Sequence, residues 1–306
     1  MTYNELWRQL TQVYDDYEAK AIARMVYEVR FGLMPSDLFI GKDTQLSTDD
    51  QKLLEEITQR LLTGEPVQYV LGEAEFGGRT FHVEPGVLIP RPETYELCEW
   101  ILSSGRQQTD TEKSEKVRCD KILDIGTGSG CIACTLAAEL PDAAVTAWDI
   151  SEDALRIAAE NAKRMGVNVK LKKQDILKIT PSPQLLPSAS LPSPFQLPSN
   201  EFDVIVSNPP YICTKEKDMM EKNVLEHEPA LALFVPDDDP LLFYRAIARY
   251  AAKALNPGGA LFFEINPLYV TEMQQMLSEE GFSHTEIKND QFGKQRFTKS
   301  CLQEKK

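Results

Sequence analysis

The segment LDIGTGSG, residues 123–130, constrains the fold of this chain more than any other stretch. An apolar run ends at Ile125, and three glycines at alternate positions then lead into an alanine-rich stretch that begins at Cys131. Glycines at the end of a strand let the backbone turn sharply and approach a ligand without obstruction by side chains. The segment therefore predicts a strand, a tight ligand-binding loop (the glycine loop, residues 126–130) and a helix. Its spacing G-x-G-x-G differs from the dinucleotide fingerprint G-x-G-x-x-G, and either pattern alone is weak evidence.

Short apolar runs alternate with amphipathic stretches from Lys121 to the end of the chain. This alternation is typical of a parallel sheet with helices on both faces, so we predict an α/β fold with a Rossmann-like doubly wound sheet. The expected strands are residues 121–125, 145–150, 169–172, 202–206, 260–265, 284–288 and 296–301. The expected helices are residues 93–102, 131–140, 153–165, 241–255 and 270–280.

The N-terminal part has a helical pattern instead. Apolar residues recur at helical spacing up to about residue 62, and one helix is expected to begin at Thr48 with Gln51 completing a capping box. The Gly77-Gly78 pair indicates a β-hairpin, and residues 87–89 indicate another short strand. We predict a small helical substrate-recognition domain over residues 1–75, a β-hairpin linker over 76–92 and a catalytic domain over 93–306.

Residues 181–200 interrupt the α/β pattern with prolines and serines and show no periodicity. Proline lacks an N–H donor and blocks helix formation, so a flexible Pro/Ser-rich surface insertion is expected between the third and fourth strands. The alternative is a proline-rich docking segment for a partner.

Charge and composition exclude several classes of partner. The chain has 33 basic and 47 acidic residues, a net charge of −14. Proteins that bind duplexes present a basic face to the phosphates, so no direct nucleic-acid partner is expected. No apolar run approaches the ~18 residues of a membrane span, and the N-terminus has no targeting pattern. We therefore expect a cytoplasmic protein without membrane contact.

Cys131 and Cys134 form a C-x-x-C pair at the start of an expected helix. Redox pairs of this kind usually belong to a thioredoxin-like unit, and a zinc site needs a second pair of ligands. Neither context is present here, so we expect small free thiols in the core and no metal.

An acidic residue ends the strand that follows the glycine loop. Asp149 is expected at the carboxyl edge of the sheet, where its carboxylate can accept the hydrogens of both ribose hydroxyls of an adenosine. The alternative role is the N-cap of the next helix, for which Ser151 is better suited. After the third strand, Asp175 or its neighbour Ile176 is placed to meet the adenine.

The pattern D-x-G-x-G-x-G followed by a strand-end acid resembles class I methyltransferases, whose cofactor is S-adenosyl-L-methionine. That cofactor has a sulfonium and no phosphate, so no basic phosphate clamp is needed, and Asp124 would offset its positive end. The alternative is a nicotinamide oxidoreductase. The predicted cofactor contacts are Asp124, Gly126, Thr127, Gly128, Ser129, Gly130, Asp149, Ile176 and Asn208.

A second motif, Asn208-Pro209-Pro210-Tyr211 (the Asn208 loop), follows the expected strand 202–206. The two prolines have no N–H to donate, so they end the hydrogen-bond ladder of the strand and fix the backbone. The asparagine oxygen and a proline carbonyl can then accept both hydrogens of one planar NH2 group, while Tyr211 offers a face for a flat substrate. Such bonds would orient an amide or amine nitrogen and stabilise the charge that develops as a methyl group arrives. We predict that these four residues are catalytic and bind the substrate; the alternative is a rigid structural turn.

The motif N-P-P-Y occurs in methyltransferases that act on adenine or cytosine amines and in those that act on protein glutamine. Over nearly all 306 residues, the chain resembles the release factor glutamine methyltransferase (PrmC/HemK) family. The matching strings are Gly64 to Tyr69, Val87 to Thr94, Ile122 to Ile132, Asp149 to Ser151, Ser207 to Ile212 and Glu228 to Leu231. The resemblance implies methylation of the glutamine in the Gly-Gly-Gln loop of class I peptide chain release factors, held in part by the N-terminal helices.

Some residues depart from the family pattern. Tyr95 replaces an acid after Pro-Glu-Thr, and residues 264–269, EINPLY, lack the usual glycine and glutamine. These departures affect local packing and partner contacts more than chemistry. For Arg91 and Glu93, an interdomain ion pair and a catalytic role both remain open.

Three other functions compete with this interpretation. A ribosomal protein glutamine methyltransferase shares both motifs, but the N-terminal helices and the Arg91 context favour the release factor. A DNA or RNA adenine amine methyltransferase is disfavoured by the acidic charge. A non-catalytic adenosine-binding adaptor is disfavoured by the intact Asn208 loop.

Overall fold

The computed structural model describes residues 1–105, 117–179 and 200–302. Its backbone divides into two compact units. The first comprises Met1–Ala74, Val83–Pro85 and Met220–Glu228, and the second comprises Glu75–His82, Gly86–Met219 and Pro229–Lys306. Within the described ranges, no helix is both long enough and apolar enough to cross a membrane.

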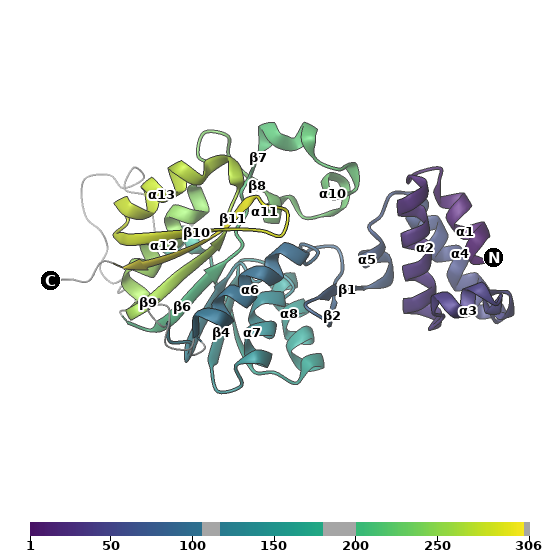
Figure 1. Cartoon of the computed structure of the whole chain (residues 1–306), viewed down its shortest axis with the longest axis horizontal. Coiled ribbons are helices and arrows are strands. Elements are labelled where there is room, and N and C mark those ends of the chain that lie inside the picture. The colour runs from purple at the N-terminus through teal and green to yellow at the C-terminus, as the bar shows by residue number, and fades with distance from the viewer. Residues whose placement is uncertain (106–116, 180–199, 303–306) are drawn as a thin grey trace. The chain divides into compact units, whose positions relative to one another are not determined.

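The first unit is helical (Figure 1). Its elements are α1 (Tyr3–Leu10), α2 (Asp16–Phe31), α3 (Pro35–Phe39), the 3-10 helix η1 (Lys42–Gln45), α4 (Thr48–Leu62), α5 (Val67–Leu71) and α10 (Lys222–His227). Apolar residues at helical spacing face a common core, where Leu10, Val26, Leu54 and Leu61 are fully buried. The predicted helical character of this part of the chain is therefore confirmed.

Helix α4 begins with a cap that the sequence prediction misplaced. The hydroxyl of Ser47 accepts a hydrogen bond from the Asp50 amide, so Ser47 is the N-cap. Gln51 does not close a capping box on Thr48, because its side chain instead donates to the carbonyl of Leu46.

The second unit contains, among its described residues, a seven-stranded sheet in the order β10-β11-β9-β6-β3-β4-β5. The strands are β3 (Lys121–Ile125), β4 (Ala144–Asp149), β5 (Val169–Lys173), β6 (Phe202–Ser207), β9 (Leu255–Glu264), β10 (Phe282–Asn289) and β11 (Gln295–Leu302). Neighbours from β5 to β9 are parallel, whereas β11 is antiparallel to both β9 and β10. The predicted doubly wound α/β class is confirmed.

Helices cover both faces of this sheet (Figure 1). One layer holds α6 (Pro92–Gly105), α7 (Cys131–Glu139) and α8 (Glu152–Met165), and the other holds α9 (Ile176–Ile179), α12 (Leu242–Ala254) and α13 (Val270–Glu279). Successive strand residues alternate between the layers, since Ile122 and Val204 pack in the first core and Leu123 and Ile205 in the second. Because both faces of the sheet are buried, the central strands are continuous apolar runs in the sequence.

Shorter elements complete the unit. The strands β1 (Glu73–Phe76) and β2 (Arg79–His82) pair across Gly77-Gly78 as the sequence predicts. Residues 87–89 do not form the expected strand; Pro85 and Pro90 bracket them, and a proline has no N–H to donate to a ladder. The others are β7 (Ile212–Cys213), which pairs with β8 (Phe234–Val235), and η3 (Thr214–Met219), α11 (Ala230–Leu233) and η4 (Pro267–Tyr269). Apart from Asn200, the predicted insertion lies outside the described residues.

Candidate active site

Two loops leave the same edge of the sheet at its centre. Strands β3 and β6 are parallel neighbours in which Asp124 pairs with Val206, so Gly126 and Asn208 each follow that pair by two residues. The strand order reverses here, because β4 lies on one side of β3 and β6 on the other. Open α/β sheets bind their ligands at this switch point. A cavity of about 330 Å³ lies at this edge, and both loops line it.

The glycine loop owes its shape to three residues in the left-handed region. Gly126, Gly128 and Gly130 have φ angles of 75°, 55° and 80°, which favour glycine. The amides of Gly126 and Thr127 donate to the Trp148 carbonyl at 2.8 and 3.0 Å, which ties the loop to β4. A Cβ built on Gly126 or Gly128 would meet no atom within 4 Å. The backbone therefore borders open space at the cavity.

Asp149 lies at the end of β4 and faces the glycine loop. Its Oδ2 accepts from the Gly128 amide and its Oδ1 from the Ser151 amide, both at 2.9 Å. Ser151, and not Asp149, caps α8, because its hydroxyl accepts from the Ala154 amide. Burial raises the pKa of Asp149, and the backbone amides act in the opposite direction. The carboxylate is thus held at the cavity with capacity for further donors.

Asp124, at the carboxyl end of β3, is fully buried below the glycine loop. The Thr127 hydroxyl donates to its Oδ2 at 2.6 Å. Burial raises the pKa of Asp124 to about 7, although the bond from Thr127 lowers it. A cationic ligand beside this group would favour its charged form.

Ile176 begins α9 and lines the cavity with Asp175. The Asp175 side chain accepts from the Leu177 amide at 3.0 Å and lies 3.4 Å from Lys178 Nζ. The carboxylate is therefore engaged within its own turn, whereas the apolar Ile176 side chain is available to flank a flat ring.

Cys131 and Cys134 are free thiols in α7. Burial raises the pKa of each to about 12, so both keep their protons at neutral pH. Protonated thiols are poor metal ligands and poor nucleophiles, which agrees with a packing role.

The Asn208 loop continues from the fully buried strand β6. Asn208, Pro209 and Pro210 line the cavity, and the Ser207 hydroxyl donates to the Ile125 carbonyl at 2.6 Å. This bond joins the start of the Asn208 loop to the strand that carries the glycine loop. The two predicted site loops are therefore brought together at one cavity.

Tyr211 differs from its three neighbours. It is not among the residues that line the cavity as described, and its hydroxyl donates to Glu264 Oε1 at 3.1 Å. Its pKa is raised, first by burial and then by the Glu264 carboxylate. The stacking role assigned to its ring stays a prediction.

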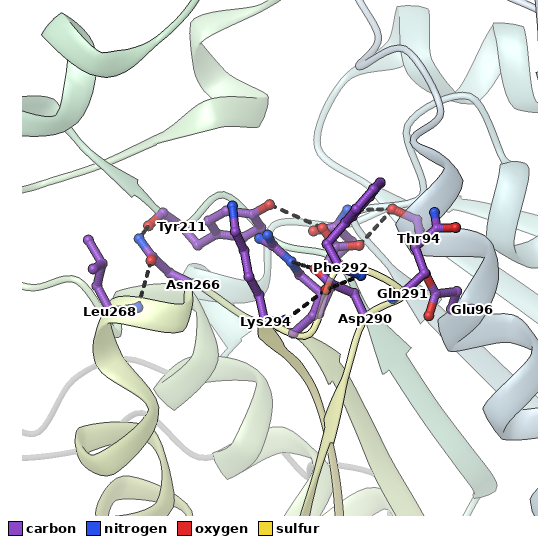
Figure 2. A network of polar contacts seen from close by, with 12 residues as sticks. Thr94, Glu96, Tyr211, Asn266, Leu268, Asp290, Gln291, Phe292 and Lys294 are labelled. Carbon is purple, nitrogen blue, oxygen red and sulfur yellow. Dashed lines mark hydrogen bonds and ion pairs between the residues drawn. The ribbon is translucent and has the colours of Figure 1, made fainter.

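The sequence prediction missed two residues at this site, Thr94 and Glu264. The Asn208 Nδ2 donates to Thr94 Oγ1 at 3.3 Å, and the Thr94 hydroxyl donates to Glu264 Oε2 at 2.6 Å. Thr94 and Tyr211, both labelled in Figure 2, thus donate to different oxygens of the Glu264 carboxylate. Thr94 ends one of the strings that match the family, whereas Glu264 begins a segment that departs from it, and a threonine in α6 and a glutamate on β9 carry no signal of mutual contact.

The departures from the family pattern have structural roles. Asn266 Nδ2 donates to the Tyr211 carbonyl at 3.1 Å (Figure 2), and the Tyr269 hydroxyl lies 3.3 Å from Cys213 Sγ. Tyr95 instead packs its ring edge-on against Phe76 of the hairpin, with centroids 5.5 Å apart. Asn266 and Tyr269, both in the departing segment 264–269, thus brace the chain just after the Asn208 loop.

Comparison with known families defines the class of the protein. A family model described as "Methyltransferase domain" matches residues 117–299, and one described as "PrmC N-terminal domain" matches residues 4–72. The sheet order, the glycine loop and the first match make this a class I methyltransferase.

Relatives identify the family within that class. The release factor glutamine methyltransferase of Bacteroides thetaiotaomicron is 43% identical over 94% of this chain and 95% of its own length. That of Flavobacterium psychrophilum is 39% identical over 95% and 94%. Among solved structures, the T. thermophilus 16S rRNA N2 G1207 methyltransferase has a TM-score of 0.49 at 20% identity, covering 76% of this chain and 50% of its own. The chain belongs to the release factor glutamine methyltransferase family.

Proposed function

We propose that this chain transfers the methyl group of S-adenosyl-L-methionine to a glutamine side-chain amide nitrogen in peptide chain release factors. The glutamine is the one in the Gly-Gly-Gln loop, and S-adenosyl-L-homocysteine is the second product. The observation that carries the proposal is the meeting of Asn208 and the glycine loop at one cavity. The names of the relatives support the choice of substrate.

The residues present fit the cofactor. Gly126 and Gly128 leave open the space that a Cβ would fill, which lets a ligand lie against the backbone. In the proposed arrangement, Asp149 accepts from the ribose hydroxyls, Ile176 flanks the adenine, and Asp124 balances the positive charge from below the loop. Thr127, Ser129, Gly130 and Asn208 complete the proposed cofactor contacts. The cofactor supplies an electrophilic methyl group on a sulfonium, which needs no metal and no covalent enzyme intermediate.

The Asn208 loop addresses the weak nucleophilicity of an amide nitrogen, whose lone pair is delocalised into its carbonyl. The Asn208 oxygen and the Pro209 carbonyl accept the two N–H hydrogens of the substrate amide and aim its nitrogen at the methyl group. As the C–N bond forms and the C–S bond breaks, the nitrogen becomes positive, and these two acceptors stabilise that charge. One proton then leaves the nitrogen to water. Pro210 and Tyr211 complete the substrate contacts.

The N-terminal helices fit a role in holding the protein substrate. The family model that matches residues 4–72 is described as "PrmC N-terminal domain". We assign residues 1–75 to substrate recognition, residues 76–92 to the linker and residues 93–306 to catalysis.

One assay tests the function. The enzyme is incubated with methyl-labelled cofactor and, separately, with purified release factor, ribosomes or DNA. We expect label on the release factor only, and none on a release factor whose Gly-Gly-Gln glutamine is replaced by alanine. Label on ribosomes or DNA, with none on the release factor, would contradict the proposal.

A further inference from the structure

The Asn208 amide is held by hydrogen bonds that run in one direction. We propose that Glu264, acting through Thr94, is a positioning residue that keeps the Asn208 oxygen toward the substrate amide and its NH2 group away from it. This inference rests on the function proposed above and adds to it two residues, Thr94 and Glu264.

Three elements that are far apart in sequence supply the chain of bonds. Glu264 ends β9 and is only 2% exposed. Thr94, in α6, is 170 residues away and donates to it at 2.6 Å. Asn208, after β6, is 114 residues from Thr94 and donates to it at 3.3 Å. Such a long-range arrangement does not arise from local backbone geometry.

The direction of these bonds follows from the chemistry of the groups. The Thr94 hydroxyl donates to Glu264 Oε2, which in the ionised carboxylate has lone pairs and no hydrogen. Since a hydroxyl has one hydrogen, Thr94 can then only accept from Asn208. The Asn208 group that faces Thr94 is therefore the NH2, and the amide plane directs Oδ1 the other way. An acceptor is thus presented where the substrate NH2 group needs one.

Glu264 also fixes the other end of the Asn208 loop. Its Oε1 accepts from the Tyr211 hydroxyl at 3.1 Å, and its own backbone carbonyl accepts from the Tyr244 hydroxyl at 3.0 Å. Burial raises the pKa of Glu264, while Thr94, Tyr211 and the nearby Arg296 charge lower it. Each carboxylate oxygen has its own donor, Thr94 on Oε2 and Tyr211 on Oε1, so one buried side chain contacts groups that hold both ends of the loop.

A reversed Asn208 amide would be unable to serve the reaction. Its NH2 group would meet the NH2 group of the substrate, donor against donor, and the developing positive charge on nitrogen would lose an acceptor. Loss of the Thr94 hydroxyl removes the preference for one orientation without removing Asn208. The expected effect is therefore on turnover and not on cofactor binding.

The test compares two identical substitutions at buried threonines. Thr94→Val removes the hydroxyl with little change of shape, and we expect kcat to fall by about 10- to 100-fold while the cofactor Kd changes by less than about threefold. Thr298→Val is the matched control, because the Thr298 hydroxyl is also buried and has no hydrogen-bond partner among the residues that the structure describes; its kcat should not change. Thr94→Ser should restore most of the rate lost in Thr94→Val. Wild-type turnover in Thr94→Val would overturn the proposal.

A second readout does not depend on the identity of the substrate. The side-chain NH2 resonances of Asn208 are assigned by NMR from their disappearance in Asn208→Asp. We expect Thr94→Val and Glu264→Gln to move these resonances, and Thr298→Val to leave them in place. If the resonances do not move in Thr94→Val, Thr94 does not hold the amide. If wild-type enzyme leaves the release factor unmethylated but the resonances move as expected, the proposed substrate is wrong and the positioning by Glu264 stands.

Discussion

The glycine loop and the Asn208 loop leave the same edge of one sheet, yet they are held in different ways. The glycine loop is fixed through its own backbone groups: left-handed glycines, two amides on the Trp148 carbonyl, one amide on the Asp149 carboxylate and the Ser129 carbonyl on Asn161. The Asn208 loop is fixed by side chains of Thr94 and Glu264 that come from distant elements. A backbone loop can lie against the length of a ligand, whereas a side-chain network can aim one atom.

This difference predicts that the two loops control different steps, cofactor binding and methyl transfer. Changes in the glycine loop should alter the affinity for S-adenosyl-L-methionine and leave the rate at saturation nearly unchanged. Changes around Asn208 should alter kcat and leave cofactor affinity nearly unchanged. Measuring both the cofactor affinity and kcat of each variant tests whether the two loops control these quantities separately.

The largest effect is expected for Asn208→Ala. The variant keeps the prolines that shape the loop but loses the oxygen proposed to accept from the substrate amide. We expect kcat to fall by about 100- to 1000-fold, the range seen when one group that stabilises a transition-state charge is removed. Cofactor affinity, measured by calorimetry, should change by less than about threefold. A large loss of cofactor affinity with little change in kcat would reverse the roles given to the two loops.

Gly128→Ala tests the other loop. The left-handed backbone costs an alanine about 1–2 kcal/mol, and its Cβ would occupy the open space beside the cavity. We expect cofactor affinity to fall by about 10- to 100-fold, with kcat at saturating cofactor within about twofold of wild type.

Gly258→Ala is the matched control for that variant. Gly258 is also left-handed, at φ 77°, with no atom within 4 Å of a built Cβ, but it does not line the cavity. The Gly258→Ala variant should lose about as much free energy of unfolding as Gly128→Ala and keep its cofactor affinity. Equal losses of affinity in both variants would mean that strain in the fold, and not the cavity, explains the effect.

The same difference decides how much of the site the sequence could predict. The glycine loop and Asp149 are visible because a strand, three glycines and a strand-end acid follow one another along the chain. The Asn208 motif is visible for the same reason, and the parallel sheet alone places it beside the glycine loop. Local patterns thus predicted most elements and the edge of the sheet at which the cavity lies.

What the sequence could not supply are pairings between distant side chains. Nothing in the pattern around Thr94 indicates a bond to Glu264, because their approach depends on how α6 packs against β9. The prediction that Thr48 is the N-cap was wrong because serine and threonine can both cap a helix. Only the backbone conformation decides which of Ser47 and Thr48 takes that position. The prediction of a short strand at 87–89 was wrong because Val87 and Ile89 are buried without entering a ladder.

A titration sharpens the role of Asp124 below the glycine loop. Burial raises its pKa to about 7, so the carboxyl of the free protein is largely protonated below that pH. A cationic cofactor favours the charged form and lowers this pKa, so affinity should rise as the pH increases toward about 7 and then level off. In Asp124→Asn this rise should flatten, and affinity at about pH 8 should be about tenfold lower than in wild type. Asp142→Asn, at an exposed carboxylate, should keep the wild-type profile.

Asn161→Asp is expected to have the smallest effect on function, although it reaches the glycine loop from α8. Asn161 is 1% exposed; its Nδ2 donates to the carbonyls of His82 and Ser129 at 2.9 and 2.8 Å, and its Oδ1 accepts from the His82 amide at 2.7 Å. An aspartate has the same shape and keeps the acceptor, but it turns an oxygen toward two carbonyls. We expect the free energy of unfolding to fall by about 2–4 kcal/mol, measured by denaturant titration.

For Asn161→Asp, cofactor affinity should fall only a few-fold, because Ser129 is one of five residues in the glycine loop and the glycines keep their conformation. Asn289→Asp, at an exposed position on β10, serves as the control for the added charge and should change neither quantity. The informative result is again whether the cofactor affinity changes without a change in kcat. A lower kcat at saturating cofactor with unchanged cofactor affinity would mean that strain in the glycine loop reaches the Asn208 loop. The two loops would then be coupled through the hydrogen bond from the Ser207 hydroxyl to the Ile125 carbonyl.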